Sequence, residues 1–277
     1  MALNIQTNVA SLEAQKSLYG NQKALMQSFN RLSSGFRVNS AADDAAGLAI
    51  SESMKSQIRS YTVAERNAAD GTSMAQTAEG ALGEVHDVLG RMRELAMQAS
   101  NGSLGSQDRS YIDTEYSSLK SEITRIQDST KFNGNKLVNA TAATLNFQVG
   151  LTASGSDQIA VTFGGVNLAA LVATANSVGG ATGSAALAAL STIDAAITTV
   201  STARSKFGTA MNRLDVATSN IQTMRLNISA ANSRIRDVDV ASETAAMSRN
   251  QVLSQAGVSV LAQSNQLPQM AFSLIQR

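Results

Sequence analysis

The sequence predicts a mainly α-helical protein in which long antiparallel helices pack as a coiled-coil-like bundle with a small β-hairpin insert. Two observations support this prediction. Apolar residues recur every seven positions over two long segments, and the 277 residues include one proline and only 4% aromatic residues. Because proline is the strongest helix breaker, almost nothing in the chain interrupts a long helix. So few aromatic side chains cannot fill a thick globular core, which favours a thin bundle.

The first predicted helix has a series of residues in alternating steps of four and three, apolar except for one polar substitution at Gln22. The series consists of Leu18, Gln22, Leu25, Phe29 and Leu32. Such spacing indicates one face of an amphipathic helix. Gly35 follows the series and supplies a left-handed cap, so residues 33–44 are expected to form a connector. Within that connector, Asn39 and Ser40 offer side-chain oxygens that can cap the next helix.

The second predicted helix spans residues 45–100 and repeats every seven residues. One column consists of Met54, Tyr61, Ala68, Ala75, Leu82, Leu89 and Ala96. Its companion column consists of Ala64, Gly71, Ala78, Val85, Met92 and Ala99. Two columns sustained over many heptads predict coiled-coil-like packing. After a break at residues 101–105, a shorter helix is predicted from the series Ile112, Tyr116, Leu119, Ile123 and Ile126.

The region from about 130 to 183 differs from the rest because it is rich in Gly, Asn, Ser and Thr. Its runs at 145–149 and 159–163 are candidate strands of a hairpin insert. The next helix has an unbroken column at Ile193, Val200, Phe207, Leu214, Ile221, Ile228 and Ile235. This column predicts a helix of about 50 residues that pairs with the helix at residues 45–100.

The last segment, residues 250–276, contains no charged side chain. An uncharged, apolar terminal helix in water promotes association, so we expect it to be buried against another terminus or another chain. The N-terminal helix is the natural companion, and we predict that the two terminal helices pair. The domain boundaries follow: residues 1–40 with 236–277 form a terminal helical domain, and residues 41–235 form a second domain that carries the insert.

Charge and residue usage exclude several function classes. The net charge is +1, which gives no electrostatic reason to expect a nucleic-acid or membrane partner. The chain has no cysteine, and His86 is its only histidine, so no catalytic triad or thiolate metal site can be assembled. Asp43 and Asp44 are better read as helix caps than as metal ligands. We therefore predict a protein that is not an enzyme and needs no cofactor or metal.

Several sequence blocks, in this order, resemble the bacterial flagellins. The N-terminal block runs from Leu32-Ser33-Ser34-Gly35 through Asn39-Ser40-Ala41-Ala42-Asp43-Asp44-Ala45 to Ser51. Further blocks are Arg91-Met92-Arg93-Glu94-Leu95-Ala96, Phe132-Asn133-Gly134, and the stretch from Met247 to Gln263. The resemblance does not cover residues 140–184. Two departures are Arg236, where glutamate is common in the family, and Val240, where an aromatic residue is frequent.

The resemblance implies a structural subunit that polymerises into the flagellar filament for swimming. It implies that the terminal domain lines the filament's inner core and the second domain surrounds it. It also implies export through the flagellar type III apparatus without a cleavable signal peptide, to an extracellular flagellum, with an export chaperone, the filament cap and the hook-junction proteins as partners. The residues expected to carry self-assembly are Leu18, Leu25, Phe29, Leu32, Leu253, Val260, Leu261 and Leu267.

In some flagellins an innate immune receptor of the Toll-like class reads the surface that corresponds to Arg91, Leu95 and Glu115. The other interpretation is that Leu95 faces neighbouring subunits and the two charged residues are a solvated helix surface. Two alternative functions also stay open. One is a hook-filament junction protein of the same apparatus, and the other is a coiled-coil signalling domain, which would require a charged, non-associating C-terminus.

Overall fold

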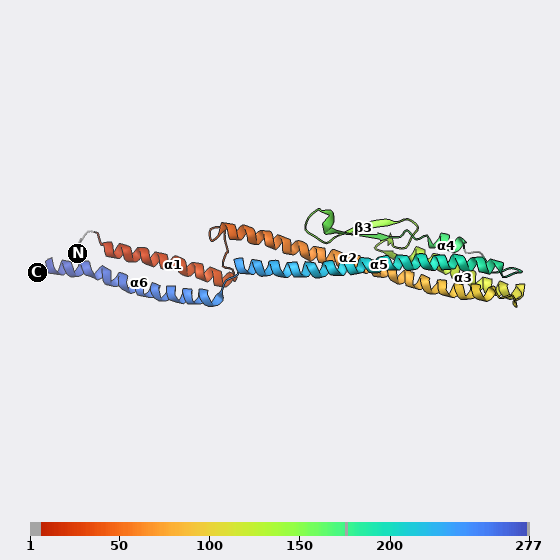
Figure 1. The fold of residues 1–277 in the computed structure, drawn as a ribbon. Helices are drawn as coiled ribbons and strands as arrows, with labels where there is room; N and C mark the ends of the chain where they lie inside the picture. Colours follow the sequence, from red (N-terminus) through yellow and green to blue (C-terminus); the bar gives the residue numbers. More distant parts are fainter. Residues whose placement is uncertain (1–6, 175–176, 276–277) are drawn as a thin grey trace. The chain divides into compact units, whose positions relative to one another are not determined.

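The computed structural model of the chain describes residues 7–174 and 177–275, with side chains for 7–173 and 177–266 (Figure 1). The helices are α1 (Val9–Ser34), α2 (Ala45–Ala99), α3 (Ser106–Ser129), α4 (Leu168–Thr174), α5 (Ser184–Arg236) and α6 (Val240–Ile275). The strands are β1 (Lys131–Phe132), β2 (Asn135–Lys136), β3 (Ala143–Gln148) and β4 (Gln158–Phe163), with a 3₁₀ turn at Gly155–Asp157. The predicted mainly α-helical fold with a β-hairpin insert is confirmed.

The chain divides into two compact units. The first consists of Met1–Ser56 with Asn227–Arg277, and the second is Gln57–Leu226. Both divisions fall inside helices α2 and α5, whereas the predicted domain boundaries lie at the connectors near residues 40 and 236. Each unit is described in turn below.

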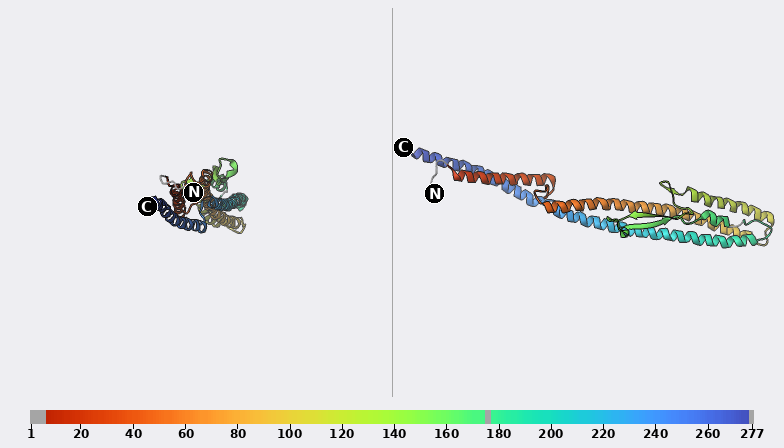
Figure 2. Two further views of the ribbon diagram at one scale, coloured as in Figure 1. Left: turned by 90° about the vertical axis from the view of Figure 1, so that its left-hand side faces the viewer. Right: turned by 90° about the horizontal axis from the view of Figure 1, so that it is seen from above.

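Helices α2 and α5 run antiparallel in the second unit (Figure 2). Their ion pairs fix the direction, because residues that come later on α2 pair with residues that come earlier on α5. The Glu65 carboxylate lies 2.8 Å from Arg225, Arg204 donates to Glu79 at 2.9 Å, and Arg93 donates to Asp194 at 2.7 Å. The heptad columns supply the core between them: Ala68, Ala75, Ala78, Leu82, Val85, Leu89, Met92, Ile193, Val200, Phe207 and Leu214 are all buried.

The insert packs on this core as an antiparallel hairpin of β3 and β4. Its register pairs Ala143 with Phe163 and Gln148 with Gln158. The Phe163 ring reaches the core, because its centroid lies 5.5 Å from that of Phe207. The predicted runs at 145–149 and 159–163 therefore match the observed strands to within two residues at each end.

A small hairpin lies at the start of the region from 130 to 183, before the β3–β4 hairpin, with β1 and β2 joined by Asn133 and Gly134. Both turn residues have positive φ, 47° and 82°, which is the backbone of a tight two-residue turn that Asn-Gly favours. This turn explains the Phe132-Asn133-Gly134 block noted in the sequence.

A buried arginine caps the C-terminal end of α2. Arg109, on α3, is 3% exposed. Its Nε donates to the Ala99 carbonyl at 2.9 Å, and its two terminal nitrogens donate to the carbonyls of Asn101 and Ala181 at 2.9 and 3.0 Å. The guanidinium thus satisfies the Ala99 carbonyl at the C-terminal end of α2, where the ladder leaves it without a partner and positive charge is favoured, together with two carbonyls of the adjoining connectors.

In the first unit, α1 ends as the sequence predicts. Gly35 has φ 74° and its N–H donates to the Arg31 carbonyl, a left-handed cap. The cap of α2 is Asp44, one of the two aspartates predicted as caps, and not Asn39 or Ser40, because Asp44 Oδ1 accepts the Gly47 N–H at 2.9 Å. The Asp43 carboxylate instead folds the connector back, accepting the Ser40 N–H at 2.9 Å.

Candidate functional site

Helices α1 and α6 pair along their length in the first unit, as predicted for the terminal helices (Figure 1). Their contacts run antiparallel: Asn8 donates to the Ser264 carbonyl at 2.9 Å, Ser11 Oγ donates to Asn265 at 2.9 Å, and Arg31 lies 3.5 Å from Glu243 near the opposite end. The helix pair is therefore held by polar contacts at both ends.

The buried line of α1 differs from the apolar series seen in the sequence. Residues that are buried or half-buried recur in steps of three and four at Ser11, Ala14, Leu18, Asn21, Leu25, Ser28 and Leu32. On α6 the matching line consists of Glu243, Met247, Asn250, Ser254, Gly257, Leu261 and Ser264. We call these two lines together the terminal seam. Its small residues allow close approach, because a Cβ added to Gly257 would lie 3.4 Å from Leu18 Cδ1.

The structure divides the expected assembly residues into two groups. Four of them, Leu18, Leu25, Leu32 and Leu261, lie on the terminal seam and pack within the chain. Three others point away from it: Phe29 is 64% exposed, Leu253 45% and Val260 56%. The eighth, Leu267, lies outside the residues whose side chains are described. The expected single apolar face on α1 needs correction, because Gln22 and Phe29 are on its exposed side.

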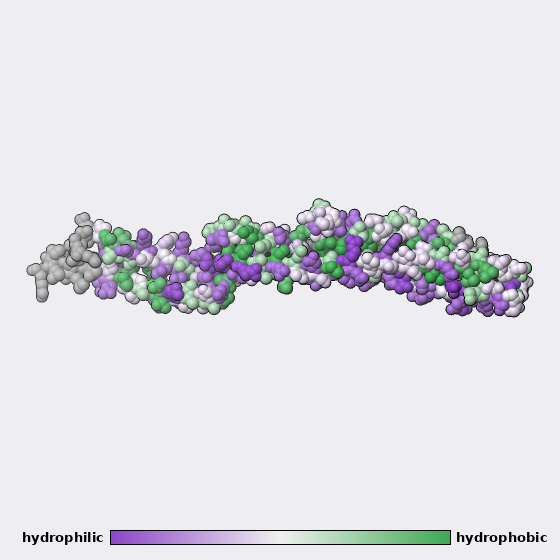
Figure 3. All heavy atoms as spheres, in the orientation of Figure 1, coloured by the Kyte–Doolittle hydropathy of each residue, from purple (hydrophilic) through white to green (hydrophobic). Residues whose placement is uncertain are grey.

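The exposed side of the terminal helices is unusually apolar. On α1 its large residues include Tyr19 and Met26, which are 74% and 68% exposed, and on α6 they include Val252 and Val258, at 63% and 54%. Figure 3 shows such hydrophobic residues interspersed with polar ones over α1 and α6. A concentration of large exposed apolar side chains on one pair of helices points to an interaction surface.

A second candidate surface contains Arg91 and Glu115, which join α2 to α3. The Arg91 Nε donates to Glu115 at 2.9 Å, and a terminal nitrogen donates to Glu94 at 3.0 Å. These hydrogen bonds, the one to Glu115 first, raise the pKa of the Arg91 guanidinium. Leu95 does not share this surface, since it is 2% exposed and packs in the core. The expectation that Leu95 contacts a receptor or a neighbouring subunit is corrected accordingly.

Residues that could carry chemistry are scattered. Within the described ranges, no three acidic or histidine side chains come close enough together to hold a metal ion. The buried Nδ1 of His86 has no hydrogen-bond partner among the described residues, so no carboxylate there orients its ring. One described helix, α5, is long and apolar enough to cross a membrane by length and composition. A core helix of a bundle passes the same test, and Ile193 and Val200 of α5 are core residues.

Comparison with known proteins gives matches over both ends of the chain. The family described as the bacterial flagellin N-terminal helical region matches residues 5–143, and the bacterial flagellin C-terminal helical region matches residues 190–275. The flagellin of Halalkalibacterium halodurans is 41% identical over 98% of this chain and 99% of its own length. The flagellin of Bacillus subtilis is 39% identical over 99% of this chain and its own full length.

Solved structures give the same result. The crystal structure of Bacillus cereus flagellin is 31% identical, with a TM-score of 0.50 over 60% of this chain and 94% of its own. A hook-associated protein of Vibrio parahaemolyticus shares the fold at 19% identity, with a TM-score of 0.59 over 70% of this chain and 100% of its own. Full-length relatives at this identity establish a family of structural proteins. The chain belongs to the bacterial flagellin family and is a structural subunit of the flagellar filament.

Proposed function

We propose that α1 and α6 form the polymerisation interface of the subunit. Residues 1–40 and 236–277 line the inner core of the filament in this proposal, and residues 41–235 surround that core. The supporting observation is the apolar surface that the terminal pair leaves exposed. Val252, Leu253, Val258 and Val260 lie on a helix whose residues from 250 onward carry no charge until Arg277.

The two groups of assembly residues have different roles in this proposal. Leu18, Leu25, Leu32 and Leu261 hold the terminal pair together within a subunit. Phe29, Leu253 and Val260 contact neighbouring subunits, and Leu267 is assigned to the same interface from its place in the uncharged segment. Burying an exposed side chain of this size contributes about 1.5–3 kcal/mol. Contacts between different surfaces on successive copies generate an open helix instead of a closed ring.

Seeded polymerisation followed by negative-stain electron microscopy tests this assignment. The double variant Leu253→Ser with Val260→Ser should keep the helical circular dichroism of the parent chain and fail to extend filament seeds. A truncation after Arg249 should fail as well. The matched control is Val216→Ser, an exposed apolar residue on α5 of the second unit, which should still polymerise. Normal filaments from the double variant would rule out this interface.

The family also supports a set of partners and a route to the cell surface. We propose that the chain leaves the cell through the flagellar type III apparatus without a cleavable signal peptide, accompanied by an export chaperone. The filament cap and the hook-junction proteins are its proposed neighbours in the extracellular flagellum. A chain without cysteine suits such a route, because no disulfide has to be reduced or formed during transfer.

A Toll-like innate immune receptor is a second proposed partner, through the surface that contains Arg91 and Glu115. Both side chains are about half exposed, at 51% and 47%, and their ion pair presents a fixed charged group across two helices. Arg91→Ala and Glu115→Ala should each weaken receptor binding, measured by surface plasmon resonance. Lys120→Ala, on the same helix α3, is the control. Equal binding by all variants would contradict this proposal.

The alternative of a hook-filament junction protein has less support. Its structural relative is 19% identical, whereas flagellins are 39–41% identical along their whole length. The signalling-domain alternative requires a charged terminal helix, and residues 250–276 have no charge. Both alternatives predict a chain that does not extend filament seeds, so the polymerisation assay separates them from the filament subunit.

A further inference from the structure

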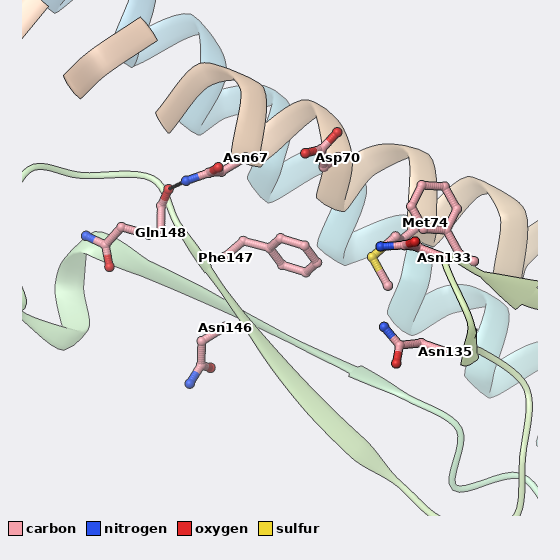
Figure 4. Close-up of a pocket in the computed structure, with 9 residues that line it drawn as sticks. Asn67, Asp70, Met74, Asn133, Asn135, Asn146, Phe147 and Gln148 are labelled. Atoms are coloured by element: carbon pink, nitrogen blue, oxygen red, sulfur yellow. Dashed lines mark hydrogen bonds between the residues drawn. The ribbon is translucent and has the colours of Figure 1, made fainter. Parts of the chain in front are cut away.

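A hollow of about 590 Å³ lies on the second unit, where the β1–β2 turn and strand β3 approach helix α2. Figure 4 shows the Phe147 side chain extending from β3 toward α2, with Asp70 and Met74 on the helix beside it. In the same view Asn133, from the turn, lies next to Met74, and Asn135, from β2, lies below them. The proposed polymerisation interface on α1 and α6 includes none of these residues.

The polar groups of this hollow are available to a ligand. Among the residues that the structure describes, no hydrogen-bond partner is found for the side chains of Asp70, Asn133 and Asn135, and all three are exposed. Asn67 is the fixed member of the group, since it donates to the Gln148 carbonyl at 3.0 Å. No lysine or arginine lines the hollow.

The apolar groups are held in place by close packing. A Cβ added to Gly71 would lie 3.0 Å from Phe147 Cδ1, so the glycine allows the ring to pack directly on α2. An edge contact to Phe163, with ring centroids 6.5 Å apart, supports the ring from the hairpin side. The turn fixes the backbone of Asn133 as well, through its positive φ of 47°. The apolar wall of the hollow is therefore preformed, and the polar side chains of Asp70, Asn133 and Asn135 are left for a ligand to order.

We propose that this hollow binds a neutral saccharide of one or two pyranose rings. Amide side chains both donate and accept, and a carboxylate accepts from two neighbouring donors, which matches adjacent sugar hydroxyls. Phe147 and Met74 provide apolar contacts for the C–H groups of a ring. The volume lies within the range of small-molecule sites, about 300–1,000 Å³. The absence of lysine and arginine from the lining disfavours anionic ligands.

The methyl group of Met74 is a direct reporter of occupancy. In the full-length monomer with ¹³C-methyl methionine, the Met74 signal is identified by its loss in Met74→Leu. N-acetylglucosamine, mannose, galactose and maltose are then titrated separately to about 10 mM, which detects complexes with millimolar dissociation constants. At least one sugar should shift the Met74 signal in a saturable manner. The signals of Met26 and Met97, exposed on other surfaces, should stay unchanged.

Variants distinguish this site from an unspecific effect. Asp70→Asn should raise the dissociation constant of the sugar about tenfold, because a charge-assisted hydrogen bond becomes a neutral one. Asn135→Ala should weaken it as well, and Gly71→Ala should displace the Phe147 ring and reduce binding. Asp87→Asn, an exposed aspartate elsewhere on α2, is the matched control and should bind as the parent does. Circular dichroism checks that each variant is folded.

Three results would overturn the proposal. The first is a Met74 signal that no sugar shifts. The second is a shift of equal strength in the parent, Asp70→Asn and Asn135→Ala. The third is a Met74 signal that the tripeptide Ala-Asn-Ser shifts at lower concentration than any of the sugars, which would assign the hollow to peptide binding instead.

Discussion

The guanidinium carbon of Arg236 lies 4.4 Å from the centroid of the Phe36 ring. The same arginine donates to Glu52 at 2.6 Å, and its backbone carbonyl accepts the Arg37 N–H at 2.6 Å. The end of α5 is thereby tied to the connector and to the start of α2, all within the first unit. The family resemblance marks Arg236 as a departure from the more common glutamate, and Glu52 supplies the complementary charge for it in this chain.

Reversing this charge should loosen the connector. In Arg236→Glu the new carboxylate faces Glu52, and the cation–π contact with Phe36 is lost. We expect a loss of about 1–2 kcal/mol in local stability. Hydrogen exchange of the Arg37 amide measures it, and a tenfold or greater acceleration is expected. In Arg236→Lys, which keeps the charge, the exchange rate of the Arg37 amide should lie between those of the parent and Arg236→Glu. An Arg37 amide as protected in Arg236→Glu as in the parent would contradict this account.

Loss of the buried Arg109 guanidinium should lower the stability of the protein by more than the loss expected for Arg236→Glu. In Arg109→Met the side-chain volume is kept, but the carbonyls of Ala99, Asn101 and Ala181 lose their donors. Each unsatisfied group costs about 1 kcal/mol, so the free energy of unfolding should fall by about 2–3 kcal/mol. Urea denaturation of the full chain gives the value. Arg213→Met removes an exposed arginine of α5 and should change it by less than about 0.5 kcal/mol.

The ion pair between Glu79 and Arg204 should contribute to the α2–α5 register. Both side chains keep about a third of their surface exposed, at 31% and 38%, so solvent screens the pair. We expect Glu79→Arg to destabilise the second unit by about 0.5–1 kcal/mol and the swap with Arg204→Glu to restore most of it. A double-mutant cycle from urea midpoints provides the coupling energy. A swapped chain no more stable than Glu79→Arg would mean that the pair has no role in register.

Protonation of the Asp43 carboxylate at low pH should weaken the hydrogen bonds that fold the connector between α1 and α2. Hydrogen bonds to its carboxylate, first from the Ser40 backbone and then from the Ser40 hydroxyl, lower the pKa of Asp43 below 3.8. A lowered pKa in the folded state means that the contribution is fully present above about pH 4 and is lost as the pH falls through the lowered value. The amide shift of Ser40 should follow this titration in an NMR pH series. In Asp43→Asn that titration should be absent, and its persistence would place the effect on another group.

Much of the second unit could be predicted because large side chains mark its core. The columns through Leu82 and Leu89 on α2 and through Val200 and Leu214 on α5 repeat every seven residues, and a coiled-coil seam of that kind is visible in the sequence. The hairpin strands were predictable for a related reason, since short runs rich in β-branched and aromatic residues are bounded by glycine. The spacing of apolar residues alone predicted the bounds of these helices and strands to within a few residues.

The terminal seam was harder to predict because its buried positions are small or polar. Ser11, Ser28 and Ser264 are 5–6% exposed, yet serine gives no hydrophobic signal. The large apolar residues of α1 and α6 partly face outward, so the visible series was displaced toward Phe29. Arg109 was missed because a single arginine in a helix usually reads as surface. Its burial depends on three carbonyls that only the tertiary fold brings together.

The pairing of the first and last helices has a kinetic consequence. The contact of Asn8 with Ser264 closes a loop of 256 residues, and loop-closure entropy grows as about (3/2)RT ln n. Folding of the second unit first shortens the effective loop and removes much of this cost, so the chain ends should be the last segments to fold. A seam in which serine, glycine, alanine and asparagine separate a few leucines offers them a smaller gain in return than a column of large apolar residues would. During that late interval α1 and α6 can pair either with each other or with the end of a growing polymer.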